Sequence, residues 1–190
     1  MTGKKIGFAI TGSHCTFAAI VDPLKKLMEG GNTLIPIISA SVAGTSTRFG
    51  QAEDWRDAFA DICRHSVIDS IKGAEEIATN KLDVVVVAPC TGNTLAKLAN
   101  AITDTPVTMV VKAQLRNEKP VVLAISTNDG LAGNAANIGK LLDKKNVYFV
   151  PFSQDNPQEK PRSLVCNMSL LADTIDNAVQ GKQIQPILLR

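Results

Sequence analysis

The sequence has few of the features that mark membrane, secreted or nucleic-acid-binding proteins. No apolar run approaches the length that crosses a bilayer, and the N-terminus has no continuous apolar core of signal-peptide length. The formal net charge is only +2, and Lys and Arg are scattered, whereas binding to a phosphate backbone needs clustered positive charge. We therefore expect a cytoplasmic protein whose partner is neither a membrane nor a nucleic acid.

Cysteine is also scarce. The four cysteines, Cys15, Cys63, Cys90 and Cys166, have spacings that fit neither a zinc ribbon nor a small disulfide scaffold. With 190 residues, 45% of them hydrophobic, the chain can bury a substantial core without cross-links, yet it is too short for two independent domains. We expect reduced thiols, no metal site and one domain spanning residues 1–190.

Short apolar runs alternate with segments of helical spacing. The runs, most of them rich in Val and Ile, cover residues 6–10, 33–38, 82–88, 121–125 and 147–150. The helical segments cover residues 17–29, 54–63, 94–101, 134–144 and 169–179. This alternation predicts an α/β fold, a three-layer, doubly wound parallel sheet of Rossmann-like type. The polar segment SQDNPQEKPR, residues 153–162, holds two prolines and predicts an exposed loop.

In such a sheet, ligands bind beyond the carboxyl ends of the strands, so the first loop, TGSHCT, is informative. Gly12 allows close approach of a ligand, and Ser13 and Thr16 place hydroxyls at a helix start, which favours a phosphate. Simple helix capping explains the same hydroxyls equally well. His14, taken alone, fits a packing or hydrogen-bonding role better than that of an acid or base. The Gly-x-Gly-x-x-Gly dinucleotide fingerprint is absent.

The loop after the third strand carries the strongest signal. Residues 87–101 read VAPCTGNTLAKLANA, in which a buried strand ends at Pro89 and a helix begins near Thr94. Small residues at 90–92 would let a flat ring approach the backbone, while Asn93 and Thr94 can cap the helix and bind a ligand. Capping alone does not explain why the preceding loop is so uniformly small. In the second loop, Ser39 adds a hydroxyl after a strand, which is a weak signal by itself.

These motifs resemble a known family. APCTGNTLAKLANAITDTP, residues 88–106, resembles the PASANT-type motif of the homo-oligomeric flavin-containing cysteine decarboxylases. That flavoprotein family also includes phosphopantothenoylcysteine decarboxylase and the flavin prenyltransferases. ITGSHCTF, residues 10–17, resembles the family's first FMN loop, and the resemblance extends from residue 4 to residue 189. It implies a flavoprotein-type domain, FMN as cofactor and a homo-oligomer, a trimer or a multiple of trimers.

The resemblance also implies roles for particular residues. Gly12, Ser13 and Ser39 match positions that hold the flavin phosphate. The positions that line the ribityl chain and the ring are matched by Pro89, Cys90, Thr91, Asn93 and Thr94. Asn128, in ISTND, falls where the decarboxylases carry an asparagine that contacts substrate.

Two departures argue against decarboxylation of a cysteine. The stretch GAEEIATNKLD lacks the histidine that precedes the motif strand in the decarboxylases, and Ile125, Ser126 and Thr127 break their Pro-x-Met-Asn signature. TRFG at 47–50, VLAISTND at 122–129 and QPIL at 185–188 resemble a different branch of the family. That branch oxidises a dihydropyridine dicarboxylate, or its hydrated precursor, to pyridine-2,6-dicarboxylate during sporulation. Its second subunit is a nicotinamide-binding protein that would supply NAD(P).

The resemblance thus predicts an oxidoreductase subunit acting on a small dicarboxylate. Aromatisation drives the reaction, so the protein has to position a dianion, remove a proton and accept a hydride. Arg48 is the first candidate for gripping a carboxylate, followed by Lys112 and Arg116, for which a solvated surface position fits better. His14 is the best placed acid or base.

Two alternatives stay open. A stand-alone FMN-dependent decarboxylase or prenyltransferase would be yellow when purified and active without a partner. A non-catalytic subunit that only delivers substrate would be colourless and would stimulate a separate dehydrogenase. The missing histidine counts against the first alternative, and the residues do not separate the second from a catalytic subunit.

Overall fold

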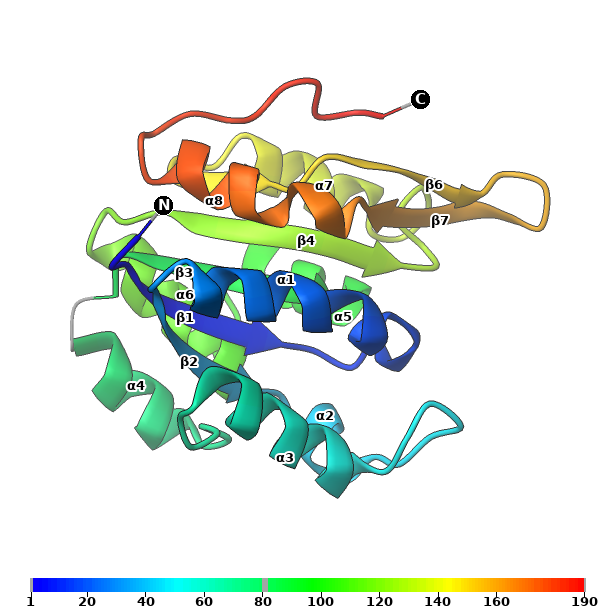
Figure 1. The fold of residues 1–190 in the computed structure, drawn as a ribbon. Coiled ribbons are helices and arrows are strands. Elements are labelled where there is room, and N and C mark those ends of the chain that lie inside the picture. The colour runs from blue at the N-terminus through cyan, green and yellow to red at the C-terminus, as the bar shows by residue number, and fades with distance from the viewer. Residues whose placement is uncertain (1, 80–81, 190) are drawn as a thin grey trace.

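A seven-stranded sheet with helices on both faces forms the centre of the molecule (Figure 1). The computed structural model describes residues 2–79 and 82–189, so residues 1, 80, 81 and 190 of the predicted domain lie outside the described part. The strands are β1 (Lys5–Ile10), β2 (Thr33–Ile38), β3 (Val84–Cys90), β4 (Val121–Thr127), β5 (Val147–Phe149), β6 (Phe152–Asn156) and β7 (Lys160–Cys166). Their order is β2-β1-β3-β4-β7-β6, and β5 also pairs with β4.

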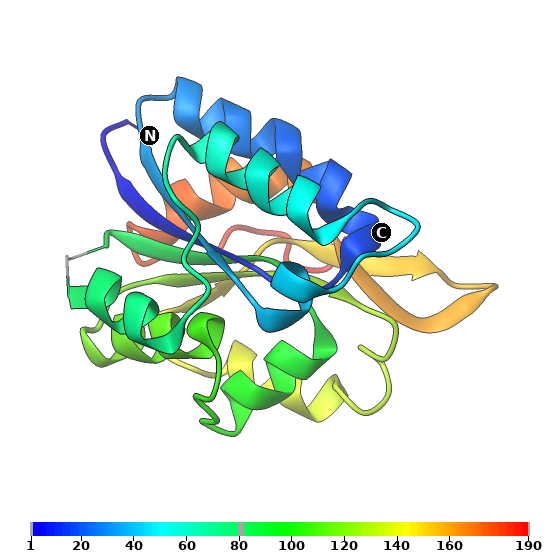
Figure 2. The same cartoon turned by 90° about the horizontal axis from the view of Figure 1, so that it is seen from below.

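The helices form two layers that enclose the sheet (Figure 2). One layer contains α1 (Phe17–Glu29), α3 (Ala52–Cys63) and α8 (Leu171–Ala178). The other contains α4 (Ile71–Thr79), α5 (Gly92–Ala99), α6 (Pro106–Arg116) and α7 (Ala135–Leu142). The short helix α2 (Ala40–Gly44) follows β2, and single turns of 3₁₀ helix, His14–Thr16 and Met168–Leu170, precede α1 and α8. The predicted three-layer α/β fold is confirmed.

The five parallel strands are ordered β2-β1-β3-β4-β5, so the direction of winding reverses between β1 and β3. Every residue of β3 is buried, as expected for a strand covered by helices on both faces. In a sheet of this order, the crevice beyond the carboxyl ends of β1 and β3 is the place where ligands bind. A ligand-binding site is therefore expected at the loops that follow these two strands.

The prediction of a loop at 153–162 is wrong. The segment forms the hairpin β6–β7, and β7 runs antiparallel to the carboxyl end of β4, where Ser126 pairs with Val165 and Thr127 with Leu164. The hairpin extends beyond the carboxyl edge of the sheet (Figure 1). Because the side chains near its tip are exposed, the hairpin has no alternation of apolar and polar residues, and Pro157 lies in its turn.

Three helices, α2, α4 and α6, were not predicted from the hydrophobic pattern, although α6 has a local signal. Pro106 is its first residue, and Thr105 and Thr108 form a reciprocal capping box, with Oγ1 of each accepting the other's backbone N–H at 3.1 Å. Helix α5 begins at Gly92, two residues earlier than predicted, with Thr91 rather than Asn93 or Thr94 as its N-cap. Among the described residues, we find no helix both long and apolar enough to cross a membrane.

Helix α5 ends in a backbone conformation that its sequence does not favour. Ala101 has φ 56°, its N–H donates to Leu98 O at 3.4 Å, and the N–H of Ile102 donates to Lys97 O at 2.9 Å. This is a Schellman ending, in which glycine is the usual left-handed residue because a Cβ is disfavoured there. Ala101→Gly should therefore raise the free energy of unfolding by about 0.5–1 kcal/mol, measured by urea denaturation.

The matched control is Ala96→Gly, in the interior of the same helix. That change should lower the free energy of unfolding by about 1 kcal/mol, because glycine is disfavoured at ordinary helical dihedral angles. Equal destabilisation by both substitutions would show that Ala101 carries no conformational strain.

Candidate functional site

Two adjoining cavities lie at the carboxyl ends of the parallel strands. The larger cavity has a volume of about 680 Å³ and the smaller cavity about 370 Å³. Gly12, in the loop after β1, and Thr91, directly after β3, line both cavities. The two cavities therefore meet where the winding of the sheet reverses, and we treat them as one candidate site.

A buried threonine in the wall of the smaller cavity holds the ends of β1 and β3 together. The side chain of Thr11 accepts the backbone N–H of Thr91 at 3.0 Å and donates its hydroxyl hydrogen to Pro89 O at 2.7 Å. Next to it, the hydroxyls of Ser13 and Ser126 are 2.8 Å apart, which links the first loop to β4. Side-chain hydrogen bonds thus hold the carboxyl ends of β1, β3 and β4 together. Sequence reasoning did not single out Thr11, although it is the first residue after a buried strand.

Neutral donors dominate the smaller cavity. Ser39, Ser41, Asn93 and Thr94 contribute hydroxyl and amide groups to its wall. Ser39 is the N-cap of α2, and the Thr94 hydroxyl lies 3.2 Å from the Thr91 hydroxyl. The N-cap of α5 makes no side-chain cap hydrogen bond, and among the described residues no side chain accepts the backbone N–H groups of its first turn. Such a wall favours an anionic group.

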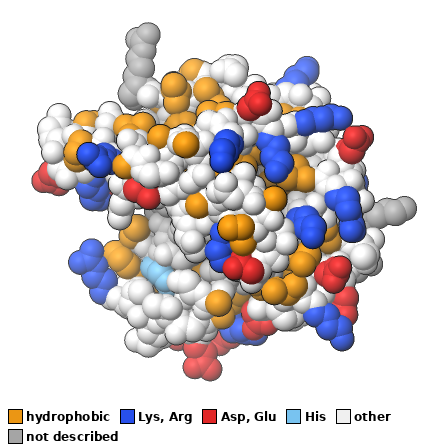
Figure 3. Space-filling model, turned by 180° about the vertical axis from the view of Figure 1, so that it is seen from behind, with side chains coloured by type: hydrophobic (Ala, Val, Ile, Leu, Met, Phe, Trp, Pro, Cys, Tyr) orange, Lys and Arg blue, Asp and Glu red, His pale blue; other side chains and the backbone are white. Residues whose placement is uncertain are grey.

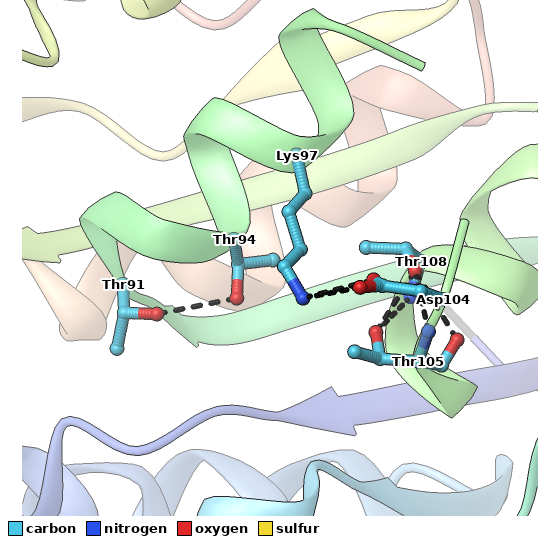
Figure 4. A network of polar contacts seen from close by, with 6 residues as sticks. All are labelled: Thr91, Thr94, Lys97, Asp104, Thr105 and Thr108. Carbon is cyan, nitrogen blue, oxygen red and sulfur yellow. Dashed lines mark hydrogen bonds and ion pairs between the residues drawn. The ribbon is translucent and has the colours of Figure 1, made fainter. Parts of the chain in front are cut away.

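A lysine adds positive charge to the smaller cavity. Lys97 reaches from α5 to Asp104, with Nζ 2.8 and 2.9 Å from the two carboxylate oxygens, beside Thr105 and Thr108 (Figure 4). The hydrogen bond from Lys97 lowers the pKa of the Asp104 carboxyl below its ordinary value. Sequence reasoning missed Lys97, although it lies within the strongest motif, three residues after Thr94 and so on the same side of the helix.

The larger cavity is enclosed by the first loop, the loop after β4 and the β6–β7 hairpin. From the hairpin, Lys160 and Asp155 form an ion pair with Nζ and Oδ2 2.8 Å apart, and this hydrogen bond raises the pKa of Lys160. Thr47 and Phe49 complete the wall from the loop after α2. The hairpin that was predicted as a loop therefore supplies one side of the site.

A hydrogen-bonded carboxylate lies at the end of β4. Asp129 accepts the Thr127 hydroxyl at 2.5 Å and the Asn134 amide at 2.9 Å on both oxygens. These bonds, with Thr127 as the main cause, lower the pKa of Asp129, so the carboxylate stays ionised near neutral pH. Between Thr127 and Asp129, the exposed side chain of Asn128 lines the larger cavity.

His14 lies between the two cavities. Its ring is partly buried and packs on Phe17 with centroids 4.8 Å apart, while Nε2 lies 3.5 Å from the Ser41 hydroxyl. His14 lines the larger cavity and Ser41 the smaller. Burial lowers the pKa of His14 below its ordinary value of 6.5, so the imidazole is neutral at neutral pH. A neutral imidazole in this position can accept a proton.

The structure brings together most of the residues predicted for the site. The smaller cavity is lined by Gly12, Ser39, Thr91, Asn93 and Thr94. Ser13, predicted to share the phosphate with Gly12 and Ser39, instead lines the larger cavity together with His14 and Asn128. The separation follows from the Ser13–Ser126 hydrogen bond, which draws this side chain toward β4.

Pro89 and Cys90 do not line either cavity. The strand β3 continues through both residues rather than ending at Pro89, and both are buried. The Cys90 thiol is directed into the protein interior, where burial raises its pKa, so it is protonated. All four cysteines are free, as predicted.

The cations predicted from the sequence lie elsewhere. Arg48 is exposed and lines neither cavity; its guanidinium carbon lies 4.9 Å from the centroid of the Phe49 ring, and Phe49 lines the larger cavity. Lys112 and Arg116 line a separate cavity beside α6. Their distance from the site follows from the course of α6, which was not predicted. Among the residues that the structure describes, the lysines lining the two cavities are Lys97 and Lys160.

Comparisons with known proteins identify similar sequences and a similar fold. Residues 1–179 match the family model described as Flavoprotein. All 190 residues align with the B subunit of dipicolinate synthase from Bacillus subtilis strain 168, at 46% identity over 95% of that protein. The crystal structure of the corresponding B subunit from Bacillus halodurans C superposes with a TM-score of 0.91 at 46% identity, covering 100% of this chain and 97% of that one.

A more distant structure shows the shared fold alone. The FMN-dependent cysteine decarboxylase SpaF superposes with a TM-score of 0.68 at 19% identity, over 92% of this chain and 97% of that one. The B subunit of dipicolinate synthase is the branch that the additional motifs TRFG, VLAISTND and QPIL indicate.

The close packing around Gly92 can be tested by adding a methyl group at this position. A Cβ at this position would lie 2.5 Å from Asn134 Nδ2, 2.5 Å from Thr127 Oγ1 and 2.7 Å from Asp129 Oδ1. Gly92→Ala should therefore disrupt the hydrogen bonds among Thr127, Asp129 and Asn134, which we call the Asp129 cluster. The free energy of unfolding, measured by urea denaturation, should fall by about 1–3 kcal/mol. Gly139→Ala, in α7 with open space around the added methyl, should instead raise it by about 0.5–1 kcal/mol. Wild-type stability in Gly92→Ala would contradict this packing.

Proposed function

The chain belongs to the Flavoprotein family, and from this premise we propose that it acts as the B subunit of a dipicolinate synthase. In this role it contributes to the oxidation of dihydrodipicolinate, or of its hydrated precursor, to pyridine-2,6-dicarboxylate during sporulation. The observation that carries the proposal is the 46% identity to the Bacillus subtilis B subunit, which extends over the whole chain. The distant decarboxylase-like structures support the fold and do not outweigh this similarity.

FMN fits the chemistry of the smaller cavity. A phosphate needs several donors and a positive charge, and the cavity offers the hydroxyls of Ser39 and Thr94, the amide of Asn93 and the ammonium of Lys97. Thr91 and Gly12, which line both cavities, would lie along the rest of the cofactor. When bound, the flavin would supply an acceptor for two electrons.

The larger cavity suits a small dicarboxylate. Lys160 lies on its wall and offers a positive charge to a carboxylate, and Asn128 offers an amide for orientation. Arg48, beside the lining residue Phe49, is a second cation near this cavity. The two carboxylates there, Asp129 and Asp155, are each engaged in hydrogen bonds, which limits their repulsion of the substrate. His14, in its neutral form, is the group that removes the proton whose loss leads to the aromatic ring.

The relatives are B subunits of a synthase, and this implies a partner subunit. We assign to that partner, an A subunit, the binding of NAD(P), because neither the loop after β1 nor any other segment of the sequence carries the dinucleotide fingerprint. Self-association as a trimer, or a multiple of trimers, is also proposed, since the larger cavity opens at the protein surface near the exposed side chain of Asn128.

The cofactor assignment is tested by the visible spectrum of the purified protein and by titration with FMN. Wild type should bind FMN, and Lys97→Met should raise the Kd about 10- to 100-fold, because a charge-assisted hydrogen bond to the phosphate is lost. Folding should change little, since the Asp104 carboxylate left behind is exposed to water. Lys25→Met, an exposed position on α1, is the control and should leave the Kd unchanged.

Turnover is measured as formation of pyridine-2,6-dicarboxylate in the presence of the A subunit. A protein that takes up no FMN but still stimulates the A subunit would be a substrate-delivery subunit. A yellow protein that forms no pyridine-2,6-dicarboxylate with its A subunit but decarboxylates a cysteine would be a stand-alone flavin enzyme. Either result would contradict the proposed function.

The role of His14 predicts a particular pH dependence. As the pH falls, kcat/KM should decline with an apparent pKa below 6.5, because the imidazole must be unprotonated to accept a proton and burial lowers its pKa. His14→Gln should remove this acid limb and lower kcat/KM about 10²- to 10⁴-fold. His65→Gln is the control, since His65 lines neither cavity and its Nδ1 lies 2.8 Å from Ser66 O. Unchanged turnover in His14→Gln would exclude His14 as the base.

A further inference from the structure

A third cavity, distinct from the two cavities of the candidate site, lies beside α5 and α6. It has a volume of about 330 Å³ and lies between the C-terminal end of α5 and one side of α6. Its walls are mainly apolar, from Leu98, Ile102, Val111 and Leu115. Figure 3 shows this side of the molecule, where apolar side chains lie among several Lys and Arg side chains. We call it the α5–α6 cavity.

Three cations surround the α5–α6 cavity. Lys112 and Arg116 belong to α6, and Lys144 follows α7. Among the residues that the structure describes, no Asp or Glu lines this cavity, and none of the three cationic side chains has an ion pair or a side-chain hydrogen bond. Lys112 and Arg116 are four residues apart on one helix, a spacing at which like charges repel. An anion bound between them would relieve this repulsion.

Three acidic residues lie close in sequence to this cavity, and within the described residues none of them forms an ion pair with Lys112, Arg116 or Lys144. Asp143, directly before Lys144, is exposed and forms no ion pair within those residues. Asp104, next to the lining residue Thr103, is bound by Lys97 on the side of the smaller cavity. Glu118, two residues after Arg116, pairs with Lys145 at 3.5 Å. The α5–α6 cavity therefore combines an apolar interior with a rim on which three cations form no ion pair within the described residues.

We propose that the α5–α6 cavity binds a small organic anion with an apolar body, namely a carboxylate carried on a short aliphatic or aromatic group. The apolar part lies against Leu98, Val111 and Leu115, and the carboxylate faces the three cations. The volume lies at the lower end of the range for small-molecule pockets, about 300–1,000 Å³, so it suits a small ligand. This site does not depend on the function proposed above, because it shares no lining residue with either cavity of the candidate site.

Octanoate is a suitable probe, and 1-octanol is its neutral counterpart of the same chain length. Isothermal titration of the full chain should show octanoate binding that is about tenfold weaker in the Lys112→Gln/Arg116→Gln double variant, since two carboxylate contacts are lost. Lys144→Gln, on a different element, should weaken it about threefold. Lys25→Gln/Lys26→Gln on α1 should leave the affinity unchanged, and 1-octanol should bind all variants equally. Saturating FMN should not displace octanoate.

Three results would overturn the proposal. The first is no binding of octanoate at up to about 10 mM. The second is equal affinity in wild type and in the Lys112→Gln/Arg116→Gln variant, which would place octanoate elsewhere. The third is a change of mass by light scattering in that variant, which would make this face a contact between copies of the chain. The substituted side chains are exposed, so the variants should fold, and circular dichroism checks this.

Discussion

The hydroxyl of Thr11 is the interaction on which the candidate site depends. The strand order reverses between β1 and β3, so the loops that leave these two strands diverge toward opposite faces of the sheet. Thr11 links the ends of the two strands, because its side-chain oxygen accepts the Thr91 N–H and its hydroxyl hydrogen is donated to Pro89 O. Being 1% exposed, Thr11 is shielded from water, which would otherwise compete for the same groups. Thr11 itself lines the smaller cavity, and the next residue, Gly12, lines both.

Two glycines at the site, Gly12 and Gly92, are required by the packing of neighbouring side chains. A Cβ on Gly12 would lie 2.5 Å from Ser41 Oγ, and a Cβ on Gly92 would meet three side chains of the Asp129 cluster. Neighbouring side chains therefore leave no room for a larger residue at either position. This packing constraint applies whether or not a ligand also approaches the backbone there. Close contact between loops from β1, β2, β3 and β4 keeps the cavity walls in place, and rigid walls reduce the entropy lost when a ligand binds.

The lysines at the candidate site are paired with carboxylates, whereas the cations around the α5–α6 cavity are not, within the residues that the structure describes. At the site, Lys97 and Lys160 are each held by a carboxylate, so their ammonium groups are positioned before any anion arrives. Around the α5–α6 cavity, Lys112, Arg116 and Lys144 have no such partner in the described part of the chain. Paired cations orient a ligand with little reorganisation, whereas unpaired ones attract it over a longer range and are screened more by salt.

The sequence by itself determined the α/β class, the sites of the loops and the family, because strand burial and the APCTGNTLAKLANA motif are local properties of the chain. It also placed Gly12, Ser39, Asn93 and Thr94 near one another, since the carboxyl ends of parallel strands share an edge. Tertiary structure alone decided the rest. The hairpin at 152–166 owes its stability to pairing with β4, which no local pattern records. The burial of Cys90 and the position of Arg116 depend on how far β3 and α6 extend and on what packs against them.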